Sequence, residues 1–306
     1  MGRRKLDGVL LLDKPVGPSS SAVLQAVKRL FNAEKVGHAG TLDPLASGLL
    51  PLLFGEATKF AQFGLDSIKE YRARVRLGVL TDSGDAEGQV LERRPVHADA
   101  GDVARVLARF RGAIEQVPPM YSALKHGGQP LYALARAGQT VARAPRRITI
   151  HELELLEFSA DLLQLRVKCS KGTYVRQLAV DVGAALGTVA HLDGLRRTAV
   201  AGFRLERAVT LDDLQALGEE ARAAWLLPAD SLLEDLPRLD LAAEPSRRFL
   251  NGQAVALQAP AQAGISGPCR VYREPGTLLG VGEAGPGGEL HPVRLLAQAA
   301  RPVASS

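Results

Sequence analysis

The stretch YRARVRLGV, residues 71–79, alternates apolar and basic side chains with a period of two residues. Successive side chains of a strand point to opposite faces, so this alternation predicts a strand with one buried face and one solvated face. The arginines at 72, 74 and 76 lie on the solvated face, and the buried face carries Tyr71, Ala73, Val75, Leu77 and Val79. A strand of this kind needs a second layer to cover its apolar side.

Segments on both sides of this strand supply that layer and further strands. Apolar runs and alternation predict strands over residues 8–12 and 163–169, and helical stripes predict helices over 19–31, 103–110 and 175–186. We therefore expect an α+β domain over residues 1–236. From about residue 237 the chain changes to short apolar segments separated by glycine turns, which predicts a small all-β module over 237–306.

The charge of the chain is unevenly distributed. The net charge is +5 and the pI about 9.3, and residues 116–151 and 162–180 contain no Asp or Glu. Acid-free basic stretches predict a positive face, for which a polyanion such as nucleic acid is the natural partner. The alternative is a solvated face with no partner. Within residues 117–147 the chain is rich in proline and glycine, which predicts a long basic insertion with a short helix near 131–137.

Composition narrows the class of protein. Only two cysteines occur, far apart in the sequence, and no spacing of cysteine and histidine is typical of a zinc site. No apolar run is long enough to cross a bilayer. We therefore expect a reduced, cytoplasmic protein without a metal ion.

The segment GHAGTLDPLASGLLP, residues 37–51, predicts a rigid glycine-rich loop that presents one carboxylate, Asp43. Pro44 keeps Asp43 extended, and a partly buried ionised carboxylate needs a nearby cation. The best candidate is Arg176, in the first turn of a predicted helix after the turn SKGT. The alternatives are that Asp43 only stabilises a turn and that Arg176 faces solvent. Likewise Tyr71 and Tyr174 could be packing residues, and His38 could hydrogen-bond within a turn.

Six long motifs occur in order, and together they carry a resemblance. They are GVLLLDKPVGPSS, VGHAGTLDPLASGLLPLLFGEATKF, KEYRARVRLGVLTDSGDAEG, PPMYSALKHGGQPLY, CSKGTYVRQLAVDVG and HLDGLRRTAVAGF. From Gly8 to Phe203 the chain resembles the bacterial TruB family of tRNA pseudouridine synthases. Its tail, with FLNGQAV, is similar to the RNA-binding module of PUA type in that family.

The resemblance implies the pseudouridine synthase fold, a mixed and mainly antiparallel sheet flanked by helices. It also implies an isomerase that converts the T-loop uridine at tRNA position 55 to pseudouridine without cofactor or metal. The implied catalytic residues are Asp43, Tyr71 and Arg176, and the implied substrate-binding residues are His38, Tyr71, Tyr174 and Leu195. The partner is the T-arm of tRNA, and we expect a monomer with no obligate protein partner and no membrane.

The chemistry of these side chains suits such a reaction. A uridine in a folded T-loop must be everted, and Tyr71 and Leu195 offer an apolar, stackable slot for it. Asp43 would then attack C1′ or remove the C2′ proton, and the sequence leaves both routes open. Tyr71 is the nearest candidate to accept the C5 proton, although tyrosine is a poor base at neutral pH.

The basic stretches would grip the RNA backbone, with residues 117–147 folding over the T-arm as a clamp. The expected RNA-contacting residues are Lys14, Met120, Lys125, Arg143, Arg146, Arg147 and Lys171.

Two other functions would use the same basic surfaces. One is a tRNA-folding chaperone for which modification is secondary, and the other is a guide-RNA-dependent relative that acts on ribosomal RNA; the basic insertion argues against the second.

Overall fold

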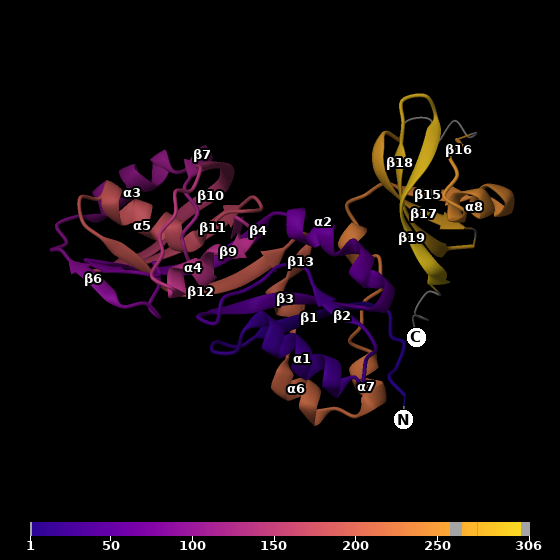
Figure 1. The fold of residues 1–306 in the computed structure, drawn as a ribbon, viewed down its shortest axis with the longest axis horizontal. Helices are drawn as coiled ribbons and strands as arrows, with labels where there is room; N and C mark the ends of the chain where they lie inside the picture. Colours follow the sequence, from indigo (N-terminus) through magenta and orange to yellow (C-terminus); the bar gives the residue numbers. More distant parts are fainter. Residues whose placement is uncertain (1, 258–264, 274, 301–306) are drawn as a thin grey trace.

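A ten-stranded sheet and a separate five-stranded sheet organise the computed structural model, which describes residues 2–257, 265–273 and 275–300 (Figure 1). The large sheet is mixed, since β1 pairs parallel with β14, β12 pairs parallel with β3, and the other neighbours are antiparallel. The predicted mixed, mainly antiparallel sheet is thus confirmed. Its path runs β14 (Val209–Thr210), β1 (Gly8–Lys14), β3 (Ala46–Phe54), β12 (Ala190–Val200), β4 (Lys69–Leu77), β11 (Leu162–Cys169), β10 (Arg146–Ser159) and β7 (Gly112–Gln116), with β2 (Val36–His38) on β3 and β13 (Phe203–Arg204) on β12.

The strand predicted from the alternation at 71–79 is β4, in the middle of this sheet. Ala73, Val75 and Leu77 are buried and the arginine at 72 is exposed, as predicted. The strand ends at Leu77 because Gly78 has φ +82°, and the chain continues into a hairpin of β5 (Val79–Thr81) and β6 (Val90–Arg93).

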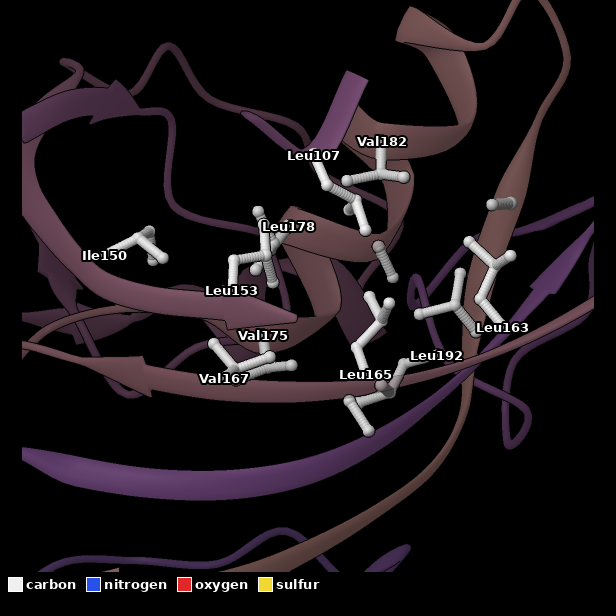
Figure 2. Packing of buried hydrophobic residues seen from close by; sticks show 14 of the residues in the cluster. Leu107, Ile150, Leu153, Leu163, Leu165, Val167, Val175, Leu178, Val182 and Leu192 are labelled. Carbon is white, nitrogen blue, oxygen red and sulfur yellow. The ribbon is translucent and has the colours of Figure 1, made fainter. Parts of the chain in front are cut away.

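Two helices cover the apolar face of β4, β11 and β10. They are α3 (Ala100–Arg109) and α5 (Val175–Ala185), and Figure 2 shows their leucine and valine side chains against those of the strands. A second cluster lies under α1 (Ser20–Leu30), whose N-cap Ser19 accepts a hydrogen bond from the Ala22 N–H. The other helical segments are η1 (Gly55–Phe60), α2 (Ala61–Asp66), η2 (Leu205–Arg207), α6 (Leu211–Ala216), α7 (Glu219–Ala223) and η3 (Ser231–Leu233).

The two halves of the large sheet meet at a short joint. β3 and β12 share three residue pairs, Leu195–Ala46, Arg196–Ser47 and Arg197–Gly48, whereas β12 and β4 share nine. Gly48 has φ +102°, and a Cβ at this position would lie 2.3 Å from the Arg197 carbonyl oxygen. Only glycine therefore lets the two strands approach at this point.

Two expectations about loops need correction. Residues 37–51 are not one loop, because β2 and β3 occupy both ends of the stretch and leave residues 39–45 as the loop. The long insertion likewise ends at residue 145, because Arg146 and Arg147 already pair with β7 as part of β10. The insertion contains β8 (Lys125–His126), β9 (Gln129–Pro130) and the predicted short helix, α4 (Leu131–Arg136).

The C-terminal sheet packs beside η1 and α2 (Figure 1). Its strand order is β15 (Arg238–Leu241), β17 (Gly267–Arg273), β18 (Thr277–Ala284), β19 (Glu289–Ala300) and β16 (Val255–Ala256), with α8 (Ala243–Leu250) beside it. Phe60 packs against Tyr272 and Leu296, and Lys59 donates a hydrogen bond of 2.9 Å to the Leu295 carbonyl. The end of the expected module, residues 301–306, lies outside the described residues. No described helix is long and apolar enough to span a membrane.

Candidate active site

A cavity of about 770 Å³ opens where the loop 39–45, the N-terminus of α5 and the insertion meet. Residues from six separate segments line it, so the fold rather than local sequence assembles the site. Among the lining side chains are five that the sequence singled out: Asp43, Tyr71, Tyr174, Arg176 and Leu195.

Asp43 and Arg176 form an ion pair across this cavity. Asp43 Oδ2 lies 3.0 Å from Arg176 Nη2, and the guanidinium is buried while the carboxylate is about half exposed. Arg176 is the second residue of α5, so the helix holds it rigidly at the cavity wall. A buried guanidinium beside a partly exposed carboxylate orients that carboxylate at the cavity wall.

A second carboxylate, Asp85, faces the same guanidinium. Asp85 Oδ2 lies 3.3 Å from Arg176 Nη1, and its other oxygen accepts hydrogen bonds from the Ser83 hydroxyl (2.6 Å) and the Glu87 N–H (3.1 Å). Asp85 is 3% exposed. Sequence reasoning missed this residue, because the segment TDSGDAEG shows only turn chemistry, and an acid inside a turn gives no signal of burial.

Arg176 also contacts the insertion. It donates hydrogen bonds of 2.7 Å to the Tyr121 carbonyl and 3.3 Å to the Ser83 carbonyl. The guanidinium thus has two carboxylates and two carbonyls as acceptors, which fixes its plane. The insertion is tied by this contact to the residue that holds Asp43.

Tyr71 lies half-buried on β4, with its ring in contact with both apolar clusters beneath the cavity. Burial raises the pKa of Tyr71, and the Arg197 guanidinium, hydrogen-bonded to the phenol, opposes part of that rise. The side chain is therefore neutral at physiological pH, and its ring offers a flat apolar surface.

Tyr174 and Leu195 complete the wall. Tyr174 is the N-cap of α5, and its backbone N–H and carbonyl both bond to the side-chain amide of Gln116, at 2.9 and 3.1 Å. Leu195 lies at the joint between β12 and β3, directly opposite Ala73 on β4. Sequence reasoning also missed Gln116, which is 3% exposed and follows no alternation that would mark it.

Two buried side chains from other elements hold the loop that carries Asp43. The Ser20 hydroxyl on α1 accepts a hydrogen bond from the Leu42 N–H (2.8 Å) and donates one to the Leu42 carbonyl (2.9 Å). Lys14 donates to the Ala46 carbonyl at 2.7 Å and to the Pro15 carbonyl at 2.8 Å. Lys14 is fully buried, so its predicted contact with RNA is wrong: carbonyl groups of the interior occupy its ammonium.

The other predicted residues lie outside the cavity. His38 pairs with Leu52 in the sheet, and burial lowers the pKa of its imidazole, so the ring is neutral. Lys171 is exposed and pairs with Asp66 at 2.9 Å. The remaining side chains lie in or beside the insertion; Lys125, Arg146 and Arg147 are exposed, while Met120 and Arg143 are half-buried.

Some polar groups in the cavity have no predicted role. Glu87 lines it, and burial together with Asp85 and Asp43 raises the pKa of its carboxyl group. Across the described part of the chain, no three His, Cys, Asp or Glu side chains gather as metal ligands would. The chemistry that the cavity offers is that of an ionised carboxylate, a fixed guanidinium and an aromatic ring.

Family descriptions match almost the whole chain. Residues 28–175 match the "TruB family pseudouridylate synthase (N terminal domain)", residues 176–234 the "tRNA pseudouridylate synthase B C-terminal domain" and residues 237–296 "Pseudouridine synthase II TruB, C-terminal". These three matches follow one another along the chain in the order expected from the resemblance.

Curated relatives and solved structures agree with this match. A protein of Dechloromonas aromatica named tRNA pseudouridine synthase B is 54% identical over 293 residues, 96% of each chain. Its namesake from Burkholderia mallei is 55% identical over 299 residues, 97% of this chain and 99% of the relative.

Among solved structures, a Cbf5-Nop10-Gar1 complex is similar at TM-score 0.71 and 29% identity, covering 92% of this chain and 79% of that one. An H/ACA RNP bound to a substrate RNA containing 2'-deoxyuridine is similar at TM-score 0.72 and 26% identity, covering 95% and 86%. The resemblance and the expected fold are confirmed: this chain belongs to the TruB family of pseudouridylate synthases.

Proposed function

We infer that this protein is a tRNA pseudouridine synthase, and we propose that it isomerises the T-loop uridine at tRNA position 55. The observation that carries the proposal is the Asp43–Arg176 ion pair at the wall of a cavity that also holds the Tyr71 ring. A cavity of about 770 Å³ has room for an everted nucleotide, since small-molecule sites usually occupy 300–1,000 Å³. Eversion costs a few kcal/mol, and stacking of uracil on Tyr71 recovers part of it.

In the proposed mechanism Asp43 breaks the bond between C1′ and the base N1. The carboxylate either attacks C1′ or removes the C2′ proton, and the half-exposed position of its oxygens suits both routes. Arg176 keeps Asp43 ionised and oriented throughout. The detached base rotates on the Tyr71 ring, and its C5 then bonds to C1′. This step displaces the Asp43 carboxylate from C1′ or accompanies return of the proton to C2′, and the C5 proton leaves to solvent while N1 takes up a proton. Because uridine and pseudouridine are isomers, the balance needs no oxidant, reductant or group donor.

The roles of the remaining side chains are part of the proposal. Leu195 and Tyr174 confine the base from the sides, and Tyr71 acts as a stacking surface, because its raised pKa keeps the phenol protonated at neutral pH and so unable to accept the C5 proton. His38 lies at the end of β2, directly before the loop 39–45, and would engage the everted nucleotides.

The wider surfaces have roles consistent with this function. We assign residues 1–236 to the catalytic domain and 237–306 to an RNA-binding module of PUA type, and the insertion to a clamp on the T-arm. Its exposed Lys125, with Arg146, Arg147 and Lys171 beside it, would contact phosphates. The proposal includes a monomeric cytoplasmic enzyme that needs no protein partner.

The test is release of tritium from tRNA labelled at uridine C5, which accompanies formation of the new bond. Wild-type protein should release one equivalent per tRNA, and Asp43→Asn should release none above background. Asp161→Asn, at an ion pair with Arg76, is the control and should keep full activity. Wild-type rates from Asp43→Asn would refute the mechanism. Refolding of tRNA by wild-type protein without tritium release would favour the chaperone instead.

A further inference from the structure

A second buried arginine, Arg197, lies directly beneath the loop that carries Asp43. It belongs to β12 and is 1% exposed. No carboxylate forms an ion pair with it anywhere in residues 2–257, 265–273 and 275–300. Placing a guanidinium in the interior without a counter-charge is costly unless hydrogen bonds satisfy it, so its acceptors are informative.

Three of these acceptors are backbone carbonyls on both sides of the loop. Arg197 Nε donates to Leu49 at 2.8 Å, Nη1 to Thr41 at 3.2 Å and Nη2 to Gly40 at 3.2 Å. Gly40 and Thr41 lie in the first half of the loop 39–45, and Leu49 lies in the strand that follows it. Only a planar fork with several fixed donors can bridge three carbonyls in this way; a lysine ammonium cannot.

The fourth acceptor is the phenol oxygen of Tyr71. The two residues lie opposite each other in the pairing of β12 with β4, and the guanidinium donates to the hydroxyl. The same side chain therefore touches the loop of Asp43 and the ring on which the base would stack. These groups come from opposite halves of the large sheet, and Arg197 stands at the joint between the halves.

The surrounding backbone is shaped to admit this side chain. Gly40 has φ +121°, and a Cβ built there would lie 3.5 Å from Arg197 Nη1. At Gly48 the Arg197 backbone leaves no space for a Cβ. The loop thus approaches the arginine closely on both sides, and its position depends on where the guanidinium lies.

We propose that Arg197 is a positioning residue for the isomerisation, and that its guanidinium sets the spacing between the Asp43 loop and the Tyr71 ring. This inference rests on the proposed function. Arg197 contacts neither the cavity nor the substrate; it acts through the two groups that do. Misplacing a reacting group by about 1 Å can cost about 100-fold in rate, so a small change at this buried residue is expected to reach the chemistry.

The test compares Arg197→Lys with Arg196→Lys, a neighbouring arginine that pairs with Asp13 at 2.6 Å on the opposite face of the strand. Single-turnover tritium release from saturating tRNA should fall ~100-fold in Arg197→Lys and less than ~3-fold in Arg196→Lys. The Kd for the T-arm should change by less than ~3-fold in both. A loss of binding equal to the loss of rate, or an unchanged rate, would overturn the proposal.

Two further readouts separate positioning from general stability. Amide hydrogen exchange over residues 39–46 should accelerate ~10-fold or more in Arg197→Lys, while exchange in α3 stays unchanged. In a Tyr71→Phe background the Arg197→Lys effect on rate should shrink, because one of its contacts is already gone. Uniform acceleration of exchange, or fully additive effects, would contradict positioning. If wild-type protein released no tritium, the proposed function would fail. The hydrogen-exchange comparison would still show whether Arg197 holds the loop that carries Asp43.

Discussion

Asp85 lies outside the Asp43–Arg176 ion pair but contacts the same arginine, so we expect its side chain to affect that pair. It and Asp43 share the Arg176 guanidinium, and Asp85 is the more deeply buried of the two. Replacing it by Asn keeps the volume but removes one of the two negative charges beside the Arg176 guanidinium, so the arginine that orients Asp43 is held less firmly. Hydrogen bonds to charged groups contribute about 1.5–3 kcal/mol, so we expect kcat to fall about 10- to 100-fold in Asp85→Asn.

The measurement is single-turnover tritium release at saturating tRNA, with thermal unfolding to verify the fold. Asp193→Asn, which removes a surface partner of Arg74, is the matched control and should retain its rate. A variant of Asp85 with wild-type kcat would show that Arg176 needs only one carboxylate.

Lys69 gives the stability of the protein a dependence on pH. Burial lowers its pKa to about 8, from 10.5 in the unfolded chain, while its ammonium donates to the Leu65 and Ser67 carbonyls. Between pH 8 and 10.5 the unfolded chain binds a proton that the folded protein has released. The contribution of Lys69 to the free energy of unfolding therefore rises with pH through this window and is constant below it.

Urea unfolding of Cys169→Ala and of Lys69→Met/Cys169→Ala at about pH 7 and pH 9.5 checks this expectation. The first substitution removes the opposing contribution of the thiol paired with Lys69. At the higher pH, the free energy of unfolding of Cys169→Ala should increase relative to that of Lys69→Met/Cys169→Ala. An equal difference at both values would mean that Lys69 stays charged in the fold.

At the scale of elements, the joint between β3 and β12 depends on one glycine. Gly48→Ala places a Cβ against the Arg197 backbone and forces a positive φ on alanine. We expect a loss of about 2–4 kcal/mol in the free energy of unfolding, because a backbone clash adds to the strain. Gly187→Ala is the control: its φ is +76° but nothing lies within 4 Å, so strain alone should cost about 1 kcal/mol.

Denaturant titration of both variants measures these losses. Equal costs at Gly48 and Gly187 would show that the strands separate easily at the joint. The Gly48 variant should also lose activity, since Asp43 lies just before β3.

The strands and helices that the sequence predicted are those with clear periodicity. The alternation in β4 and β11 and the stripes of α1, α3 and α5 each gave the right element, because one face is apolar. β12 was missed as a strand, since its pattern is broken by Gly194 and by the buried Arg197. β10 escaped for a related reason: bulges between Ile150 and Glu152 and between Leu155 and Glu157 interrupt its alternation.

The candidate site was predictable only in part, for physical reasons. Asp43 and Arg176 were paired from the sequence because one follows a glycine-rich segment and the other a strand-to-helix turn, and the resemblance gave Tyr71, Tyr174 and Leu195 their roles. The side chains that hold them, such as Asp85, Gln116 and Ser20, are polar residues whose burial depends on tertiary contacts. Lys14 was wrongly assigned to RNA because a lysine beside proline gives no sign that carbonyls surround it.

At the scale of the whole molecule, basic side chains around the cavity should make tRNA binding sensitive to salt. Each phosphate contact releases counterions, so removing one should reduce the slope of log Kd against log salt by about 1. We expect this for Arg147→Gln, measured by filter binding between about 50 and 200 mM salt. Lys59→Gln, at the seam with the C-terminal sheet, should leave the slope unchanged. An unchanged slope for Arg147→Gln would remove it from the RNA interface.

One cysteine in each sheet reports the stability of that sheet. Burial raises the pKa of Cys169 and Cys269 to about 11, and both are free thiols. The thiolate is the reactive form, so alkylation in native buffer should be at least ~100-fold slower than in urea. Site-resolved mass spectrometry over a urea series gives one midpoint for each cysteine. Coincident midpoints are expected, because Phe60 and Leu296 pack the two sheets together. Widely separated midpoints would show that the seam does not couple them.

The short pairing of β3 with β12 also determines how the two halves of the large sheet are held together. The two halves of the large sheet are joined along three residue pairs, whereas β12 and β4 within one half share nine. The Asp43 carboxylate belongs to the half of the sheet that contains β3, and the Arg176 guanidinium to α5, which packs on the half that contains β12 and β4. Their ion pair therefore bridges the two halves of the sheet beside the joint.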